Sequence, residues 1–159
     1  MPQSDIQSIE IANEIIIPEI IRLLNEGHTT TFRVKGFSMR PFLESNRDSV
    51  LLAKAESPKI GDAVLAEVAP KRYVLHRLIA IDGDKATLRG DGNLSNEYCR
   101  MSDIHGVALG FYRKGRTTLD PTDGKKWKRY SYIWTRLYPI RRYLLAIYRR
   151  LIKYKLYKP

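Results

Sequence analysis

Residues 73–89 predict a β-hairpin: Tyr73-Val74-Leu75-His76-Arg77-Leu78-Ile79-Ala80-Ile81, then Asp82-Gly83-Asp84, then Lys85-Ala86-Thr87-Leu88-Arg89. The two outer runs have the apolar and β-branched content of strands. Asp82-Gly83 between them is a strong turn signal, because glycine accepts the positive φ of a tight turn. Similar short runs occur at residues 29–34, 48–54, 63–68 and 104–112. This density of short strands predicts a mainly β domain.

A helix is predicted before the first strand. Ser4 or Asp5 can cap it, and Pro18 predicts either a kink or the start of a second helix, because proline removes an internal hydrogen bond. Glu26-Gly27-His28 provides a stop, with glycine in the capping role. One apolar face, which we expect to pack on the sheet, is formed by residues at three- and four-residue spacing: Ile9, Ala12, Ile16, Ile20 and Leu23.

Charge is distributed unevenly along the 159 residues. The net charge is +11, but residues 1–112 carry 13 Lys and Arg against 15 Asp and Glu, whereas residues 113–159 carry 15 against 2. Glycine, proline and polar residues between Lys114 and Gly124 resemble a linker. We therefore divide the chain into a helical segment at 1–28, a β domain at 29–116 and a basic tail at 117–159.

Composition also limits the compartment and the chemistry. The longest stretch without a charged residue, 104–112, has nine residues, whereas a membrane-spanning helix needs roughly 20 apolar residues. The N-terminus lacks the basic region of a signal peptide, and the single Cys99 forms no disulfide and no recognisable metal motif with the three histidines. We expect a cytosolic protein, without metal or cofactor, in which Cys99 is a small, partly buried residue.

A candidate nucleophile lies in Val34-Lys35-Gly36-Phe37-Ser38-Met39-Arg40-Pro41. Gly36 and Pro41 suit a serine held at a rigid bend, where the Ser38 N–H is available to an oxyanion. A serine hydroxyl needs a base within hydrogen-bond reach to act at neutral pH. An ordinary turn is the other interpretation of this segment.

His76 is the candidate base. Strand alternation places it on one face with Val74 and Leu78, and Tyr73, Leu75 and Arg77 on the other. Burial among apolar neighbours disfavours imidazolium, so we expect a neutral histidine that can accept a proton from Ser38. A buried histidine bonded only to the backbone is the alternative.

Asp91 is the candidate third member, in Arg89-Gly90-Asp91-Gly92-Asn93. A carboxylate there could hold the imidazole tautomer and stabilise imidazolium. Glycine and aspartate are also common turn formers, which gives both Asp91 and Asp62 a purely structural interpretation.

Taken in order, Gly36-Phe37-Ser38-Met39-Arg40-Pro41, Gly61-Asp62-Ala63-Val64, residues 73–79 and Gly90-Asp91-Gly92-Asn93 resemble the motif boxes of type I signal peptidases and LexA-like serine peptidases. The resemblance covers about residues 29–112. It implies a signal-peptidase/LexA-like β catalytic domain that cleaves extended signal or leader segments, next to small residues, through an acyl-enzyme on Ser38.

The resemblance also implies roles for single residues. The base falls at His76, as in the histidine-containing branch of signal peptidases, where the aspartate at the position of Asp91 assists catalysis and that of Asp62 is mostly structural. The chain departs from the family in lacking a predicted transmembrane anchor, a repressor-type DNA-binding segment, and a hydroxyl at Gly36 to support the oxyanion hole. A catalytically weak peptide-binding or membrane-interaction module on the same fold is the alternative function, and processing of a small modified peptide is an alternative substrate.

The tail interleaves aromatic residues with Lys and Arg from Lys125 to Lys158. Rings of this kind and basic residues favour an anionic membrane surface. A helix is expected after Pro139, with Arg142, Arg149 and Lys153 opposite an apolar stripe of Ile140, Tyr143, Leu144, Ile147, Leu151 and Tyr154. We predict that residues 125–159 form a peripheral membrane anchor. Packing of the stripe on the catalytic domain and binding of nucleic acid are the alternatives, the latter the least favoured.

Overall fold

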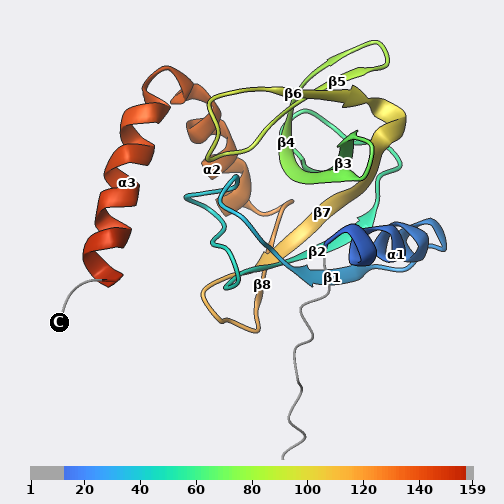
Figure 1. Cartoon of the computed structure of the whole chain (residues 1–159), viewed down its shortest axis with the longest axis horizontal. Helices are drawn as coiled ribbons and strands as arrows, with labels where there is room; N and C mark the ends of the chain where they lie inside the picture. Colours follow the sequence, from blue (N-terminus) through green and yellow to red (C-terminus); the bar gives the residue numbers. More distant parts are fainter. Residues whose placement is uncertain (1–12, 157–159) are drawn as a thin grey trace, which may run out of the picture.

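A curled, eight-stranded antiparallel sheet dominates the computed structural model, which describes residues 13–156 (Figure 1). Its strands lie in the order β1-β2-β7-β3-β4-β5-β6, and β8 pairs with β7. The strands are β1 (Thr30–Arg33), β2 (Ser49–Lys54), β3 (Ala63–Ala69), β4 (Arg72–Asp82), β5 (Lys85–Arg89), β6 (Glu97–Arg100), β7 (Ile104–Tyr112) and β8 (Leu119–Pro121).

The predicted hairpin is present as β4 and β5. Asp82 pairs with Lys85 across the turn, and Gly83 has a φ of 57° there, a conformation that favours glycine. On its other side β4 pairs with β3, so that His76 lies opposite Val64. The first half of β4 is therefore paired with β3 and its second half with β5, and the two pairings meet at Arg77.

Both faces of the curled sheet are covered. On one side, Ala63 and Leu65 belong to a core with Val50, Leu52 and Phe111. On the other, a second core consists of Val64, Ala66, Leu78, Ala86, Leu88 and Ile104. β3 is consequently buried on both faces, which explains its continuous run of apolar residues.

The N-terminal helix α1 (Asn13–Asn25) covers one end of the first core. It buries Ile17, Ile20 and Leu24, so the predicted face is correct at Ile20 but is displaced by one residue on either side. The helix continues through Pro18. It ends as expected, since Gly27 has a φ of 89° and the His28 N–H donates to the Leu23 carbonyl at 3.0 Å. The predicted cap at Ser4 or Asp5, and Ile9 and Ala12, lie outside the described residues.

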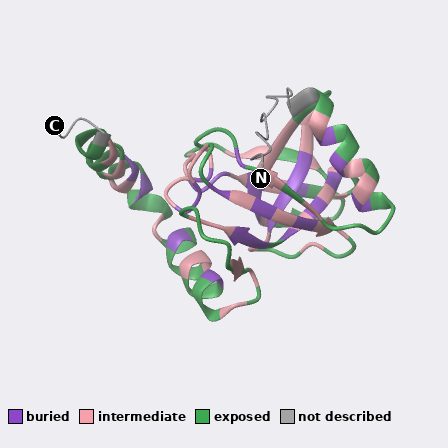
Figure 2. Cartoon of the chain, turned by 90° about the horizontal axis from the view of Figure 1, so that it is seen from below, coloured by how far each residue is buried: buried purple, intermediate pink, exposed green. Residues whose placement is uncertain are grey.

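Two helices follow the sheet: α2 (Lys125–Arg136), then α3 (Arg141–Leu156) after the short 3₁₀ segment η2 (Tyr138–Ile140). α2 lies against the body, whereas α3 stands at its side and extends away from the sheet (Figure 2). A further 3₁₀ segment, η1 (Met101–Asp103), joins β6 to β7.

The mainly β fold with an N-terminal and a C-terminal helix is confirmed. The short strands β6 and β8 and the separate helix α2 were not predicted, and β8 lies within the segment predicted as a linker. Cys99 is partly buried, as expected, on β6. Between residues 13 and 156, no helix combines the length and the apolar character needed to cross a bilayer.

Candidate active site

Ser38 lies in the loop between β1 and β2, half-buried, and the loop of residues 90–93 packs directly against it. The Gly92 N–H donates to the Ser38 carbonyl at 2.7 Å. A side-chain Cβ at Gly90 would stand 2.3 Å from the Ser38 carbonyl oxygen, and one at Gly92 would stand 2.6 Å from that of Phe37. Glycine is thus required at both positions by close approach to the serine segment.

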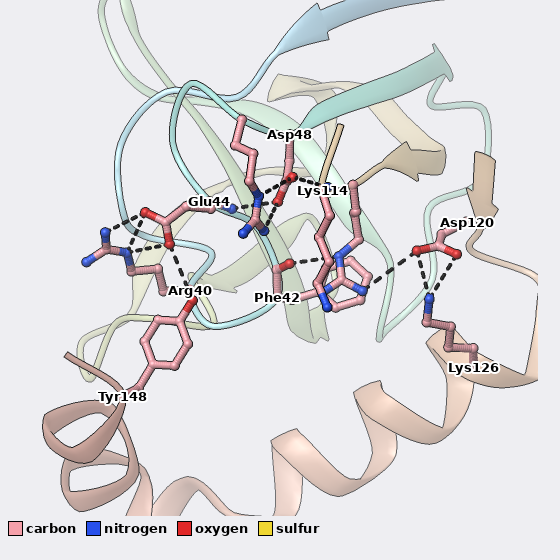
Figure 3. A network of polar contacts seen from close by, with 10 residues as sticks. Arg40, Phe42, Glu44, Asp48, Lys114, Asp120, Lys126 and Tyr148 are labelled. Atoms are coloured by element: carbon pink, nitrogen blue, oxygen red, sulfur yellow. Dashed lines mark hydrogen bonds and ion pairs between the residues drawn. The ribbon is translucent and has the colours of Figure 1, made fainter. Parts of the chain in front are cut away.

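Ion pairs hold the rest of the serine loop (Figure 3). The buried Asp48 carboxylate accepts hydrogen bonds from the backbone N–H groups of Glu44 (2.8 Å) and Lys114 (2.9 Å) and from the Arg47 side chain (2.8 Å). Glu44 in turn pairs with Arg40, two residues after Ser38. These contacts hold the part of the loop that follows Ser38.

His76 lies on β4, only 3% exposed. The predicted alternation of this strand is confirmed, because Val74 and Leu78 pack in one core and Tyr73 and Leu75 in the other. The Cδ2 edge of its ring faces the 90–93 loop, since a Cβ at Gly90 would lie 3.1 Å from that atom. A Cβ at Gly90 would also touch the Ser38 carbonyl oxygen. Gly90 therefore lies between the edge of the imidazole ring and the serine backbone.

Ser38 and His76 line the same cavity, which has a volume of about 110 Å³. Its other walls are largely apolar and come from α1, β1, β3 and β4: Ile17, Phe32, Val34, Met39, Leu65, Tyr73, Val74 and Leu75, with Lys35 at the serine loop. Sites for drug-sized ligands are roughly 300–1,000 Å³. This cavity is therefore suited to a single small side chain.

Burial lowers the pKa of His76 to about 4, and the nearby cationic Arg72 acts in the same direction, while the negative charge of Asp91 opposes them. The imidazole is neutral at pH 7, as predicted from the apolar pattern of the strand. A neutral imidazole can accept a proton from a serine hydroxyl. No hydrogen bond joins Ser38 Oγ to His76 among residues 13–156. Contacts of this kind commonly tighten only when substrate is bound.

A carboxylate that the sequence did not point to lies beside the imidazole. Glu97, at the start of β6, places Oε2 2.7 Å from His76 Nδ1, although the angle falls short of a hydrogen bond, and neither atom has a hydrogen-bond partner elsewhere in the described chain. The other Glu97 oxygen pairs with Arg72. With Nδ1 facing Glu97, Nε2 is the nitrogen left for Ser38.

The available signal for Glu97 was weak. It stands 21 positions after His76, and only the β4-β5-β6 meander brings the two together. In β6, Glu97 and Cys99 are partly buried while Tyr98 and Arg100 are exposed. A glutamate on the inward face of a strand was the only sequence signal, and it becomes visible only once Glu97–Arg100 is recognised as a strand.

Asp91 is buried on the far side of its loop, in a clamp with Arg77. The Arg77 guanidinium donates to both carboxylate oxygens at 2.8 Å, and the Tyr130 hydroxyl of α2 donates to Oδ2 at 2.7 Å. The Trp134 indole also donates to the Asp91 backbone carbonyl at 2.9 Å. These bonds join β4, the 90–93 loop and α2, and the role of Asp91 in orienting the imidazole stays a prediction.

Asp62 shapes the turn before β3. Its carboxylate accepts the Lys59 N–H at 2.8 Å, and its carbonyl accepts the Leu78 N–H at 2.9 Å. These are the contacts of a structural residue, in line with the role implied by the resemblance. Within the described part of the chain, no three His, Cys, Asp or Glu side chains converge in a way that could hold a metal ion.

The four sequence boxes thus converge on one region of the molecule. The serine loop, β4 and the 90–93 loop meet around the 110 Å³ cavity, and Gly61 accepts a hydrogen bond from Arg77 at 3.0 Å through its carbonyl. Comparisons of the chain with protein-family models, with curated proteins and with solved structures find no match.

Proposed function

We propose that this chain is a serine endopeptidase on a signal-peptidase/LexA-like fold, with Ser38 as nucleophile and His76 as general base and then general acid. One observation supports this more than any other. A serine and a buried, neutral histidine line the same small cavity, and the far nitrogen of that histidine faces a carboxylate. A serine, a neutral histidine and a carboxylate are the groups that serine hydrolases use, which supports the proposal.

The proposed reaction proceeds in two halves. Ser38 Oγ attacks the carbonyl carbon of the scissile peptide bond while its proton passes to His76 Nε2. Collapse of the tetrahedral intermediate breaks the C–N bond, and His76 returns the proton to the leaving amine. Water then attacks the Ser38 ester, again with His76 as base, and releases the free carboxylic acid and the Ser38 hydroxyl. Glu97 stabilises the transient imidazolium at Nδ1, and the Ser38 N–H is the proposed oxyanion donor.

The substrate we propose is an extended signal or leader segment with a small residue next to the cut. The cavity volume of about 110 Å³ supports this size class. Its apolar walls favour side chains such as alanine or valine over charged ones, because an unpaired charge is costly to bury there.

The proposal is tested by labelling the purified full chain with a serine-reactive acylating probe, followed by digestion of a leader-peptide library read by mass spectrometry. We expect labelling and cleavage in the wild type and neither in Ser38→Ala or His76→Ala. Ser95→Ala, at an exposed serine, is the matched control and should behave as wild type. Library peptides that bind the wild type but are not cut would replace this proposal with the peptide-binding module.

A further inference from the structure

The two halves of the basic tail have different surroundings. In α2, Trp127 and Trp134 are buried, and Tyr130 bonds the Asp91 carboxylate. Trp127, Tyr130 and Trp134 of α2 therefore pack on the protein body, whereas Tyr132 is 59% exposed. α3 has more exposed large apolar side chains than α2 and is the stronger candidate for an external surface.

α3 is attached to the body along one side. At its start the buried Arg141 donates to the Trp134 carbonyl at 3.0 Å, and Leu145 is 3% exposed. Further along, the Tyr148 hydroxyl lies 3.3 Å from Glu44 Oε2 in the serine loop (Figure 3). These contacts orient the helix and leave its opposite side to solvent.

The solvent side of α3 and η2 is apolar. Five large side chains are between 47% and 67% exposed: Ile140, Tyr143, Ile147, Leu151 and Tyr154. Their spacing of three, four, four and three residues places them within an arc of roughly 80° at 3.6 residues per turn. We call this stripe the outer face. A soluble surface rarely exposes a contiguous apolar stripe of this kind without an interaction partner.

Positive charge lies beside the outer face. α3 contains six Lys and Arg residues and no acidic residue, and no Asp or Glu follows Asp123 in the chain. Arg150 borders the outer face, and Lys153 and Arg142 follow it round the helix away from that face. All three are exposed, and we call them the cationic flank. The helix therefore combines an exposed apolar stripe with a cationic flank.

We propose that α3 is a membrane-docking helix, which lies in the plane of an anionic phospholipid bilayer with its outer face among the acyl chains and its cationic flank at the headgroups. A second copy of the chain is a poorer occupant, because the cationic flank would repel its own counterpart. Nucleic acid is also poorer, because aliphatic Ile and Leu side chains occupy the face where stacking rings would be needed.

Docking of α3 would bring the candidate active site to the bilayer surface. The inner side of the helix, through Leu145, Tyr148 and Arg149, lines a cavity of about 220 Å³ whose opposite wall includes Phe37 and Ser38. The membrane proposal itself does not depend on the chemistry of Ser38. If the proposal is correct, any peptide bound beside Ser38 would be held at the bilayer surface.

Vesicle sedimentation with the full chain tests the proposal, with phosphatidylcholine vesicles compared with vesicles of phosphatidylcholine and phosphatidylserine. We expect binding to the anionic vesicles that weakens with salt. Ile147→Gln combined with Leu151→Gln should weaken it by about 100-fold, because two fully buried apolar side chains are removed from lipid. Arg142→Gln combined with Arg150→Gln should weaken it by about 25-fold at low salt, at roughly fivefold per charge.

Two controls keep the result interpretable. Ala146→Gln adds the same polar group at an exposed position of α3 outside the outer face and should bind as wild type, and circular dichroism should show equal helix content in all variants. Ser38→Ala should also bind as wild type, which separates this test from that of the peptidase. Binding that is unchanged by Ile147→Gln with Leu151→Gln, binding only to a single-stranded oligonucleotide, or a dimer without vesicle binding would each overturn the proposal.

Discussion

At the scale of single residues, the main difference between expectation and structure is the carboxylate beside His76. Asp91 was predicted there from a local motif, yet both of its oxygens bind other groups. Glu97 lies 2.7 Å from the imidazole instead. A glycine-flanked aspartate is visible in a sequence, whereas a glutamate delivered by strand pairing is not. Local motifs therefore pointed to the serine and the histidine that line one cavity but not to the carboxylate nearest the imidazole.

The Glu97 assignment predicts a defect in turnover. In Glu97→Gln the charge that stabilises imidazolium is lost while the side chain keeps its size, so kcat should fall by about 10- to 100-fold, part of the contribution of a general base. KM should change little. Glu56→Gln, at an exposed glutamate, is the control for loss of one negative charge.

A second readout separates positioning from mere packing. The ¹⁵N resonances of His76 should show the Nδ1–H tautomer in the wild type and a mixture of tautomers in Glu97→Gln, because the Glu97 carboxylate 2.7 Å from Nδ1 favours a proton on that nitrogen. An unchanged tautomer together with unchanged kcat would show that Glu97 has no role at the site.

At the scale of elements, strands with a strong apolar pattern were predictable and strands that depend on a partner were not. Residues 85–89 and 104–112 were predicted with their observed bounds. β6 and β8 contain Glu97, Arg100, Asp120 and Pro121, residues with little strand preference. They form because β5 and β7 offer them unpaired edges. The predicted apolar face of α1 was one residue away from the observed one on either side of Ile20. Isoleucine occupies positions 15, 16 and 17, so the sequence pattern fits more than one choice of buried face.

The second prediction concerns the buried Arg77–Asp91 pair, to which α2 is joined by Tyr130 and Trp134. Asp91→Asn keeps the shape of the side chain but leaves the Arg77 charge, which is 1% exposed, without its partner. Breaking such a pair costs about 3–5 kcal/mol. We expect the free energy of unfolding, measured by urea denaturation, to fall by that amount.

Two variants complete this experiment. Asp84→Asn, at an exposed aspartate, should change the stability by less than about 0.5 kcal/mol. Arg77→Met combined with Asp91→Leu should recover most of the loss, because a buried ion pair can often be replaced by apolar side chains. Equal stability of Asp91→Asn and Asp84→Asn would contradict the structural role that we assign to the clamp.

At the scale of the whole molecule, the candidate active site and the proposed membrane-docking helix belong to different parts of the chain and meet beside Ser38. Residues 30–112 form most of the sheet and, with Ile17 of α1, the cavity with His76, and α3 forms one wall of the second cavity beside the serine. The uneven charge was readable from the sequence. The division of the tail into a helix that packs most of its aromatic side chains inward and a helix that exposes an apolar stripe was not, because both helices contain many aromatic and basic residues.

Burial of His76 makes the stability of the whole fold depend on pH. Its pKa is about 4 in the folded protein and close to 6.5 when unfolded. As pH falls below 6.5 the unfolded chain binds a proton that the folded protein does not, so the free energy of unfolding decreases. The decrease continues until about pH 4 and reaches about 3 kcal/mol. Glu97, Asp91 and Arg72 are the charged groups that we place around the ring.

Urea denaturation at intervals between pH 7.5 and 4.5 measures this effect. The wild type and His28→Gln, at an exposed histidine, should lose stability across this window with similar slopes. His76→Gln should be less stable at pH 7 but should lack the corresponding part of the slope, because no group at that position titrates. A wild-type stability that stays constant from pH 6.5 to 4.5 would show that His76 is protonated as readily in the folded protein as in the unfolded chain. In that case His76 would not be the neutral base on which the proposed chemistry depends.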